Sequence, residues 1–376
     1  GEAQARKIAQ AGVAEAFAWF RSQTVQPVRE FAPRRDLAAD PPIDETEDPV
    51  LGLVRSFEIS PGIWGRYVVR RGGRSEPFTD LNVNGRFDAG EPYVDADKNG
   101  HWTPASGARD VSFERGLDVA GTVWRIESEG LVFLRPRADL PLGEGSNRRI
   151  GRVMVTTELR RMTMAPPAAS PLLARDPSQV QLLSRVKVRS PDAVALSTSD
   201  VGTLATVNDA EIDAVNASAR IPGLDVSVPS VFGVELDKLK VMADVSTLAS
   251  SSGDDVPSTI APQQLVVVEA PQPLVFDVTR PLKGSSGTLV VRGDVEIRAG
   301  SNSFFSGLLY VDGDLTVQAP CFLRGVIVVT GRLEMAGTGG DYVEIEYDGS
   351  MLGDMMRRMG RYRMSKACLL YTSPSP

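Results

Sequence analysis

Two segments of the chain, 76–88 and 91–103, repeat one another and carry the residues best suited to chemistry. In the first copy, side chains with oxygen atoms occupy alternate positions, a glycine follows them, and a glutamate closes the loop. Ca²⁺ binds hard oxygen atoms, and this spacing is typical of a calcium loop of the EF-hand type. The predicted ligands are Asp80, Asn82, Asn84, the backbone carbonyl of Arg86, Asp88 and Glu91.

The second copy predicts a second calcium loop with fewer ligands. Its candidates are Asp95, Asp97, Asn99 and the carbonyl of His101, and Ser106 stands where a closing glutamate is expected. We therefore expect a weaker site unless Asp110 or another residue completes it. The flanking sequence is not clearly helical, so the pattern indicates EF-hand-type loops at 76–106 within a β domain rather than an EF-hand domain. The alternative is a pair of Asx-rich turns without a metal ion.

We expect Ca²⁺ to be a structural cofactor that stabilises a long connection, and we expect no enzymatic activity. Serine–histidine, cysteine–histidine and zinc sites need histidine or several cysteines, and the chain has one histidine and two cysteines. Cys321 lies in an apolar run and is predicted to be a small core residue. A carbohydrate-active enzyme that uses the acidic residues Asp294, Asp312 and Asp314 stays open as an alternative.

The composition predicts a turn-rich β protein. The 376 residues include 35 glycines and 26 prolines, and only 6% are aromatic. The net charge of −7 comes without a basic stripe, so we expect no nucleic-acid partner. The chain contains no apolar run of the length that a transmembrane helix needs, so no segment of it is expected to span a membrane.

The first half of the chain predicts an α-helix followed by an antiparallel sheet. Residues 1–33 form an amphipathic segment with Ile8, Gly12, Ala16, Trp19 and Phe20 near one face. Short runs of β-branched and aromatic residues then predict an antiparallel β domain over 34–165, which carries the calcium loops. Residues 166–182 are rich in proline and predict a linker.

A second repeat predicts a parallel β-solenoid over 183–350. Three copies of the pattern G-x-[LI]-[VY]-V-x-G begin at Gly287, Gly307 and Gly325, at nearly equal intervals. Such intervals suit one coil of a solenoid, with two short strands hinged at the second glycine of each copy. The alternative is an antiparallel meander with evenly spaced turns.

The C-terminal segments have separate interpretations. Residues 351–367 carry methionines and a leucine at helical spacing and predict a helix that caps the open end of the solenoid. Residues 368–376 read like a translated sequencing adapter and are predicted not to belong to the protein. The sequence is therefore expected to be a metagenomic fragment, truncated at both ends.

Several segments of this chain resemble PilX-type pilus assembly proteins, which are relatives of type IV minor pilins. They are the helical segment 3–16, the segment Trp124-Arg-Ile-Glu-Ser128-Glu-Gly130, the strand segment 149–155, and the repeats near Gly307 and Gly325. The resemblance implies a non-enzymatic envelope component of a bacterium with a Gram-negative type of envelope. It would serve a type IV pilus or a type II secretion-like assembly.

The same resemblance implies partners and a location. The N-terminal helix would contact other pilins or secretion-system subunits, and a membrane anchor would lie upstream of Gly1. The protein would be held in the inner membrane or in a surface filament, with its β domains outside the cytoplasm. The main alternative is a secreted, calcium-stabilised β-solenoid adhesin or surface protein with a cleavable export signal.

Overall fold

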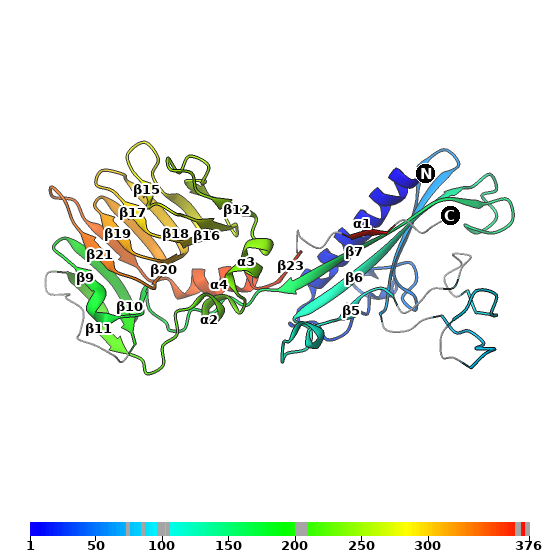
Figure 1. The fold of residues 1–376 in the computed structure, drawn as a ribbon, viewed down its shortest axis with the longest axis horizontal. Helices are drawn as coiled ribbons and strands as arrows, with labels where there is room; N and C mark the ends of the chain where they lie inside the picture. Colours follow the sequence, from blue (N-terminus) through cyan, green and yellow to red (C-terminus); the bar gives the residue numbers. More distant parts are fainter. Residues whose placement is uncertain are drawn as a thin grey trace. The chain divides into compact units, whose positions relative to one another are not determined.

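The computed structural model describes residues 1–72, 76–83, 87–95, 102, 106–199 and 210–364, and the backbone of 370–372 (Figure 1). The chain forms two compact units. Unit 1 consists of Gly1–Arg161 and Tyr362–Pro376, and unit 2 consists of Met162–Arg361. The predicted fold class is confirmed, because an N-terminal helix with an antiparallel sheet precedes a parallel β-solenoid.

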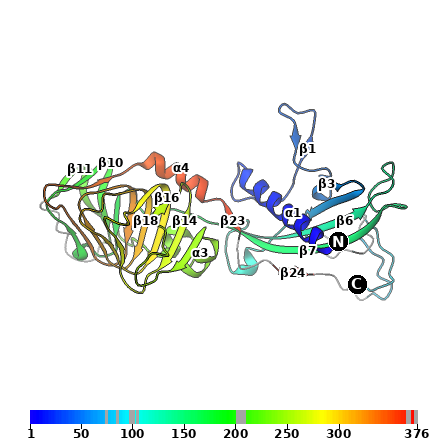
Figure 2. The same ribbon diagram turned by 90° about the horizontal axis from the view of Figure 1, so that it is seen from above.

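Unit 1 is built on an antiparallel sheet with one long helix along it (Figures 1 and 2). The strand order is β23-β7-β6-β4-β3, and the short strands β5 and β24 pair with β6 and β7. The elements are α1 (Glu2–Ser22), β3 (Gly52–Ser60), β4 (Ile63–Arg70), β5 (Arg109–Asp110), η1 (Phe113–Arg115), β6 (Val123–Leu134), β7 (Arg148–Arg161), β23 (Tyr362–Met364) and β24 (Leu370–Thr372), with a separate hairpin of β1 (Arg35–Asp36) and β2 (Ile43–Asp44).

The predicted helical face is buried, but the helix is shorter than the segment 1–33. Ile8, Gly12, Ala16, Trp19 and Phe20 are all buried against the sheet. The helix ends at Ser22 because the next residue is extended, and two glutamine side chains satisfy carbonyl groups of the last turn. The amides of Gln23 and Gln26 donate to the carbonyls of Trp19 and Phe20, each at 3.0 Å.

Unit 2 is inserted between two paired strands of unit 1. Arg161, the last residue of β7, is the cross-strand partner of Tyr362, the first residue of β23. Tyr362 is fully buried in the core of unit 1, where its hydroxyl accepts a hydrogen bond from Val28 N–H at 3.0 Å and donates to the carbonyl of Gly121. Unit 1 therefore needs the chain that returns after unit 2.

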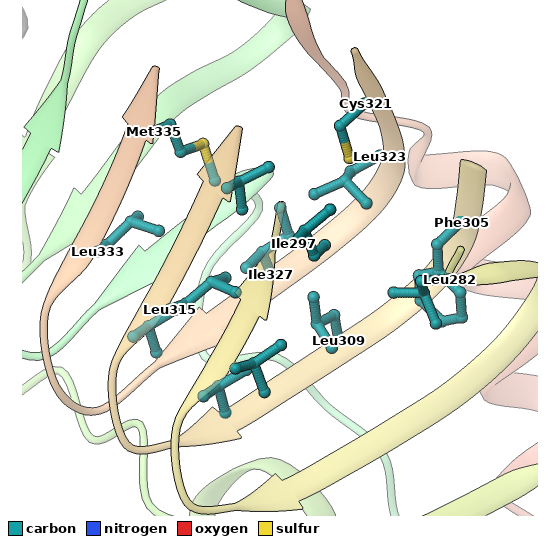
Figure 3. Close-up of a cluster of buried hydrophobic side chains, with 14 of the residues drawn as sticks. Leu282, Ile297, Phe305, Leu309, Leu315, Cys321, Leu323, Ile327, Leu333 and Met335 are labelled. Carbon is teal, nitrogen blue, oxygen red and sulfur yellow. The ribbon is translucent and has the colours of Figure 1, made fainter. Parts of the chain in front are cut away.

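Unit 2 is a solenoid of two parallel sheets that enclose an apolar core (Figure 3). The large sheet has the order β11-β10-β22-β20-β18-β16-β14-β12, and the small sheet has the order β15-β17-β19-β21-β9. The large sheet contains β8 (Leu172–Ala174), β10 (Val186–Thr198), β11 (Glu211–Arg220), β12 (Val245–Leu248), β13 (Thr259–Ile260), β14 (Leu265–Glu269), β16 (Lys283–Arg292), β18 (Ser303–Asp312), β20 (Cys321–Val329) and β22 (Val343–Glu346), and the small sheet contains β9 (Val180–Leu182), β15 (Leu274–Phe276), β17 (Val295–Ile297), β19 (Leu315–Gln318) and β21 (Leu333–Ala336).

The glycine repeat marks successive coils, as predicted, and the meander is excluded for these strands because all their pairings are parallel. Gly287, Gly307 and Gly325 are in register on neighbouring strands. A Cβ atom on Gly307, which has φ of 141°, would lie 1.9 Å from the carbonyl oxygen of Gly287. The repeat therefore keeps glycine where the backbones of neighbouring coils come closest.

The proline-rich segment 166–182 is not a linker. It contains β8, the 3₁₀ turn η2 (Pro177–Gln179) and β9, and all three residues of β8 are fully buried. The prolines flank these short strands and do not interrupt them. Strands β8 to β11 stack beyond the last coil of the glycine repeat, because β8 pairs with β20 and β10 pairs with β22. The order of the coils in space therefore differs from their order along the chain.

The predicted capping helix over 351–367 is also wrong in its place and its length. Helix α4 (Gly349–Met359) lies on the outer face of the large sheet, over β16, β18 and β20, beside a cluster that includes α2 (Val228–Phe232) and α3 (Leu236–Met242). Its Leu352, Met355 and Met359 are buried against apolar residues of that face. An amphipathic helix matches an apolar sheet face better than the polar backbone at the end of a solenoid.

Two remaining predictions concern Cys321 and the C-terminus. Cys321 is 4% exposed and lies in the solenoid core, as predicted, and burial raises the pKa of its thiol to about 12 (Figure 3). The backbone of 370–372 pairs with β7 in unit 1. These residues belong to the segment 368–376 whose sequence resembles a translated adapter.

Candidate functional site

The two copies of the calcium-loop repeat pair with each other as antiparallel segments. Thr79 N–H donates to the carbonyl of Pro92 at 2.8 Å, and Val94 N–H donates to the carbonyl of Pro77 at 2.9 Å. Thr79 and Val94 are equivalent positions of the two copies, and so are Pro77 and Pro92. The paired segments 77–79 and 92–94 are therefore related by a local two-fold axis.

An aromatic cluster supports the paired copies. Phe87 stacks on Trp102 with ring centroids 4.5 Å apart, and Phe78 lies edge-on to both rings. Tyr93 completes the cluster beside Phe87. Phe78 and Tyr93 are equivalent positions of the two copies, as are Phe87 and Trp102. The connection thus has an aromatic core that the sequence reasoning missed, although the repeat itself carried the signal.

Glu91 occupies the position expected of the closing carboxylate in the first loop. Its side chain is buried, with the residue 7% exposed, and its two oxygens accept hydrogen bonds from Leu81 N–H at 2.8 Å and from Asp88 N–H at 2.9 Å. The amide of Asn82 donates to Asp88 Oδ2 at 2.6 Å. Of the predicted ligands, Asn82, Asp88 and Glu91 are thus connected within one loop, and Asp80 lies in the same loop.

Half of the predicted ligands are outside the described residues. They are Asn84 and Arg86 of the first loop and Asp97, Asn99 and His101 of the second. Asp95 is described and is half-buried. Within the described part of the chain, no three acidic, histidine or cysteine side chains gather as a metal-binding group. The side chains of Asp80, Asn82, Asp88 and Glu91 all offer hard oxygen atoms, which suits Ca²⁺ better than a soft-ligand metal.

Glu76 is the counterpart of Glu91 in the other copy, and the sequence reasoning did not select it. It is only 4% exposed, and its carboxylate lies 4.0 Å from Arg70 Nη1. Arg70 is also 3.7 Å from Glu129, and burial lowers the pKa of this guanidinium, which still faces two carboxylates. In the sequence repeat, Glu76 and Glu91 occupy the same position of the two copies.

Asp110, the residue expected to complete the second loop, has other partners. Its carboxylate accepts hydrogen bonds from Ser112 N–H at 2.9 Å and from Gly121 N–H at 2.6 Å. These bonds hold the two sides of the turn between β5 and β6. The expectation that Asp110 is available to a metal ion therefore lacks support in the geometry.

The helix and strand segments that carry the resemblance contact each other closely. A Cβ atom on Gly130 of β6 would lie 2.1 Å from the carbonyl oxygen of Ala5 and 2.5 Å from Ala9 N. A Cβ atom on Gly12 of α1 would lie 2.3 Å from Ser128 Oγ. Small residues on both sides therefore let the backbone of α1 lie directly on β6.

The acidic residues at the solenoid corners have structural partners. Asp294 Oδ1 accepts a hydrogen bond from Asp314 N–H at 2.9 Å, and Asp314 Oδ1 accepts one from Arg332 N–H at 2.7 Å. Asp312 Oδ1 accepts one from the hydroxyl of Thr330 at 2.8 Å. Each carboxylate thus joins its own coil to the next, which gives these residues a role without catalysis.

Comparisons with known proteins add little. Neither a protein-family model nor a curated protein sequence matches the chain. The structure is similar to that of the competence-associated pilin ComZ from Thermus thermophilus, at 10% sequence identity over 98% of this chain and 97% of the ComZ chain, with a TM-score of 0.26. A likeness at this TM-score does not establish a shared fold. No helix in the described part of the chain has the length and apolar character needed to cross a membrane.

Proposed function

We propose that this protein is a non-enzymatic component of a type IV pilus or a type II secretion-like assembly in a bacterial envelope. The contact between α1 and β6 supports the proposal. Ala5, Ala9 and Gly12 on the helix meet Ser128 and Gly130 on the strand, and these are segments through which the chain resembles PilX-type proteins. A helix docked in this way is part of a folded unit and can present its other face to a partner.

The outward face of α1 is the surface we propose for contact with other pilins or secretion-system subunits. Arg6, Lys7, Gln10 and Ala14 are exposed along it. A photo-crosslinker at Ala14 in the full-length protein, expressed in cells that assemble the filament, should capture a pilin-like subunit. A crosslinker at Val278, an exposed residue of unit 2, is the matched control. Equal capture from both positions would contradict a specific role for α1.

The proposal also predicts a membrane-anchoring segment ahead of α1. The codons upstream of Gly1 should encode a short basic leader and about 20 apolar residues that run into the helix. An ordinary cleavable export signal would instead favour a secreted, calcium-stabilised adhesin or surface protein. That second candidate is kept because of the paired loops, in which Glu91 is buried at the closing position.

We further propose that Ca²⁺ stabilises the paired loops of unit 1. The support is the set of oxygen ligands in the first loop, closed by Glu91 and paired through the local two-fold axis. Isothermal titration of the full chain with CaCl₂ should show binding that Asp80→Ala and Glu91→Ala each weaken. Unchanged affinity in both variants would reject the loop as a calcium site.

A further inference from the structure

One end of unit 1 brings together the start of α1, the turn between β3 and β4, and the loop between β6 and β7 (Figure 1). Arg135 N–H donates to the carbonyl of Gly62 at 2.8 Å, which joins the loop to the turn. Gly1 lies against β7, because a Cβ atom on Gly1 would be 2.9 Å from the carbonyl oxygen of Ile150. The three segments therefore share one surface at the end of unit 1 where α1 begins.

The loop between β6 and β7 is held by one buried side chain. Asn147 is 1% exposed, and its amide nitrogen donates to the carbonyls of Arg137 and Leu140 at 2.8 Å and 2.9 Å. Its amide oxygen accepts a hydrogen bond from Arg137 N–H at 3.1 Å. The guanidinium carbon of Arg135 lies 4.6 Å from the ring centroid of Trp64. Because the loop is already ordered, docking on a partner costs it little conformational entropy.

The first residues of β7 place an apolar side chain beside two arginines. The pairing of β7 with β6 shifts between Val132 and Phe133, and Ile150 is the residue of β7 that has no partner there. A bulge of this kind redirects a side chain out of the regular alternation of the sheet. Ile150 is 42% exposed, and both Arg148 and Arg149 are exposed next to it.

Basic side chains outnumber acidic ones on this surface, although the whole chain is acidic. The net charge of −7 arises in unit 2, because unit 1 contains nearly equal numbers of acidic and basic residues. Two of the acids already have partners, since Asp139 lies 2.6 Å from Arg137 and Glu58 accepts a hydrogen bond from Gly62 N–H at 3.1 Å. Arg148 forms no ion pair within the described part of the chain. The basic residues are Arg6, Lys7, Arg135, Arg137, Arg148 and Arg149, and the acidic residues are Glu2, Glu58, Asp139 and Glu144.

We propose that this surface docks on a membrane that contains anionic lipids. The guanidinium groups of Arg148 and Arg149 would contact lipid phosphates, and the side chain of Ile150 would enter the boundary between headgroups and acyl chains. The exposed apolar side chain favours a bilayer over an acidic protein, because a bilayer has an apolar layer directly beneath its phosphates.

The proposal rests on the envelope location proposed above and adds the surface against which unit 1 lies there. Each basic residue near an anionic membrane adds only modest affinity, so docking by itself is weak and depends on salt. An anchor in the same membrane would raise the effective concentration of the surface at the lipid, so weak docking is sufficient to orient unit 1.

The test is co-sedimentation of the full chain with vesicles of phosphatidylcholine alone and of phosphatidylcholine with one third phosphatidylglycerol. We expect binding to the anionic vesicles only, and we expect it to fall as the salt concentration rises. Arg148→Gln combined with Arg149→Gln should weaken this binding at least about tenfold, whereas Arg148→Lys combined with Arg149→Lys should preserve it. Ile150→Ser should weaken it as well, because the apolar contact is lost.

A matched control is available in unit 2. Arg357 and Arg358 are adjacent, exposed arginines of α4, so replacing both with glutamine changes the net charge of the chain by the same amount. This control should leave vesicle binding unchanged. Circular dichroism melts accompany each variant. If the double variant at 148 and 149 melts early, Arg148→Gln alone replaces it, because Arg148 is exposed and has no ion pair among the described residues.

Three results would overturn the proposal. They are the absence of binding to the anionic vesicles, equal binding to the neutral vesicles, and equal weakening by the two pairs of glutamine substitutions. Binding to poly-L-glutamate without binding to anionic vesicles would also overturn it and would indicate an acidic protein as the partner. Failure here leaves the contact proposed for α1 intact, because crosslinking from Ala14 measures that contact independently.

Discussion

Both units of this protein contain an internal repeat, but the copies are related in different ways. In unit 1, the segments 77–79 and 92–94 of the calcium-loop repeat pair about a local two-fold axis, so each copy donates one backbone hydrogen bond to the other. In unit 2, coils are stacked by translation, so each coil leaves a further edge to be paired. The paired repeat depends on two backbone hydrogen bonds and on the aromatic cluster beside them. The stacked repeat depends on close backbone approach in every coil and on elements that cover its sides and ends.

The largest expected effect is on the stacked repeat. Gly307→Ala would place a Cβ atom 1.9 Å from the carbonyl oxygen of Gly287, and we expect it to destabilise unit 2 by about 3 kcal/mol or more. Gly300→Ala is the control, because Gly300 also has a positive φ but has open space around it, and it should cost about 1 kcal/mol. Scanning calorimetry measures both. Equal losses would show that backbone conformation, and not contact between coils, is the limiting factor.

The paired repeat should respond to calcium, whereas the stacked repeat should not. All four tryptophans lie in unit 1, so their fluorescence reports on its unfolding. At a free Ca²⁺ concentration 100 times the Kd, we expect a stabilisation of about 2.7 kcal/mol that chelation removes. Glu91→Gln and Glu76→Gln should each reduce it, and Glu114→Gln, at an exposed acid outside the loops, should not. If only Glu91→Gln has an effect, the two-fold relation does not extend to metal binding.

A smaller effect tests the link between the two units along the chain. Tyr362→Phe removes the hydroxyl that accepts a hydrogen bond from Val28 N–H and donates one to the carbonyl of Gly121. Both backbone groups then lose this hydrogen-bond partner in a buried place. We expect the free energy of unfolding of unit 1 to fall by about 2 kcal/mol. Urea denaturation followed by tryptophan fluorescence should show this as a lower midpoint. Tyr347→Phe, in unit 2, is the control and should leave that midpoint unchanged.

The smallest effect concerns a helix that covers the stacked sheet. Asp348 accepts a hydrogen bond from Met351 N–H at 2.9 Å at the start of α4, and this bond, with those from Ser350 and the charge of Arg324, lowers the pKa of the carboxyl group. Because the pKa is lower in the folded state, the stabilisation is complete above the unfolded-state pKa of about 4 and disappears as the pH falls through the folded-state value. Asp348→Ala should lower the free energy of unfolding of unit 2 by about 1 kcal/mol at neutral pH. The difference from the wild type should shrink in acid, and a difference independent of pH would contradict this origin.

The sequence predicted the repeats well because each depends on local spacing. The glycines at 287, 307 and 325 and the buried face of α1 are found where the pattern placed them. Strands β8 and β9 of the solenoid were missed because they lack the glycine pattern and because prolines next to short buried strands suggest a linker. Because α4 follows the last coil along the chain, it was predicted to cap the end of the solenoid. Its apolar side chains instead pack on the outer face of the large sheet.

For the candidate site, the sequence pattern selected residues of the first loop that contact one another, but it did not predict how the two copies pair, and calcium binding itself stays a prediction. Asn82, Asp88 and Glu91 follow from spacing alone, and the structure connects them. Glu76 was missed because a linear calcium-loop motif looks for a closing residue after each loop, whereas Glu76 precedes both loops. Asp110 was suggested by its proximity in sequence, but its hydrogen bonds to Ser112 and Gly121 determine its place.

The insertion of unit 2 between Arg161 and Tyr362 has a consequence for synthesis on the ribosome. Unit 2 is one continuous segment, so it can fold as soon as residues 162–361 have left the exit tunnel. Most of unit 1 precedes unit 2 in the chain, yet unit 1 cannot complete its core until Tyr362 arrives. Most of unit 1 is therefore translated before unit 2 but can complete its fold only after unit 2 has been made.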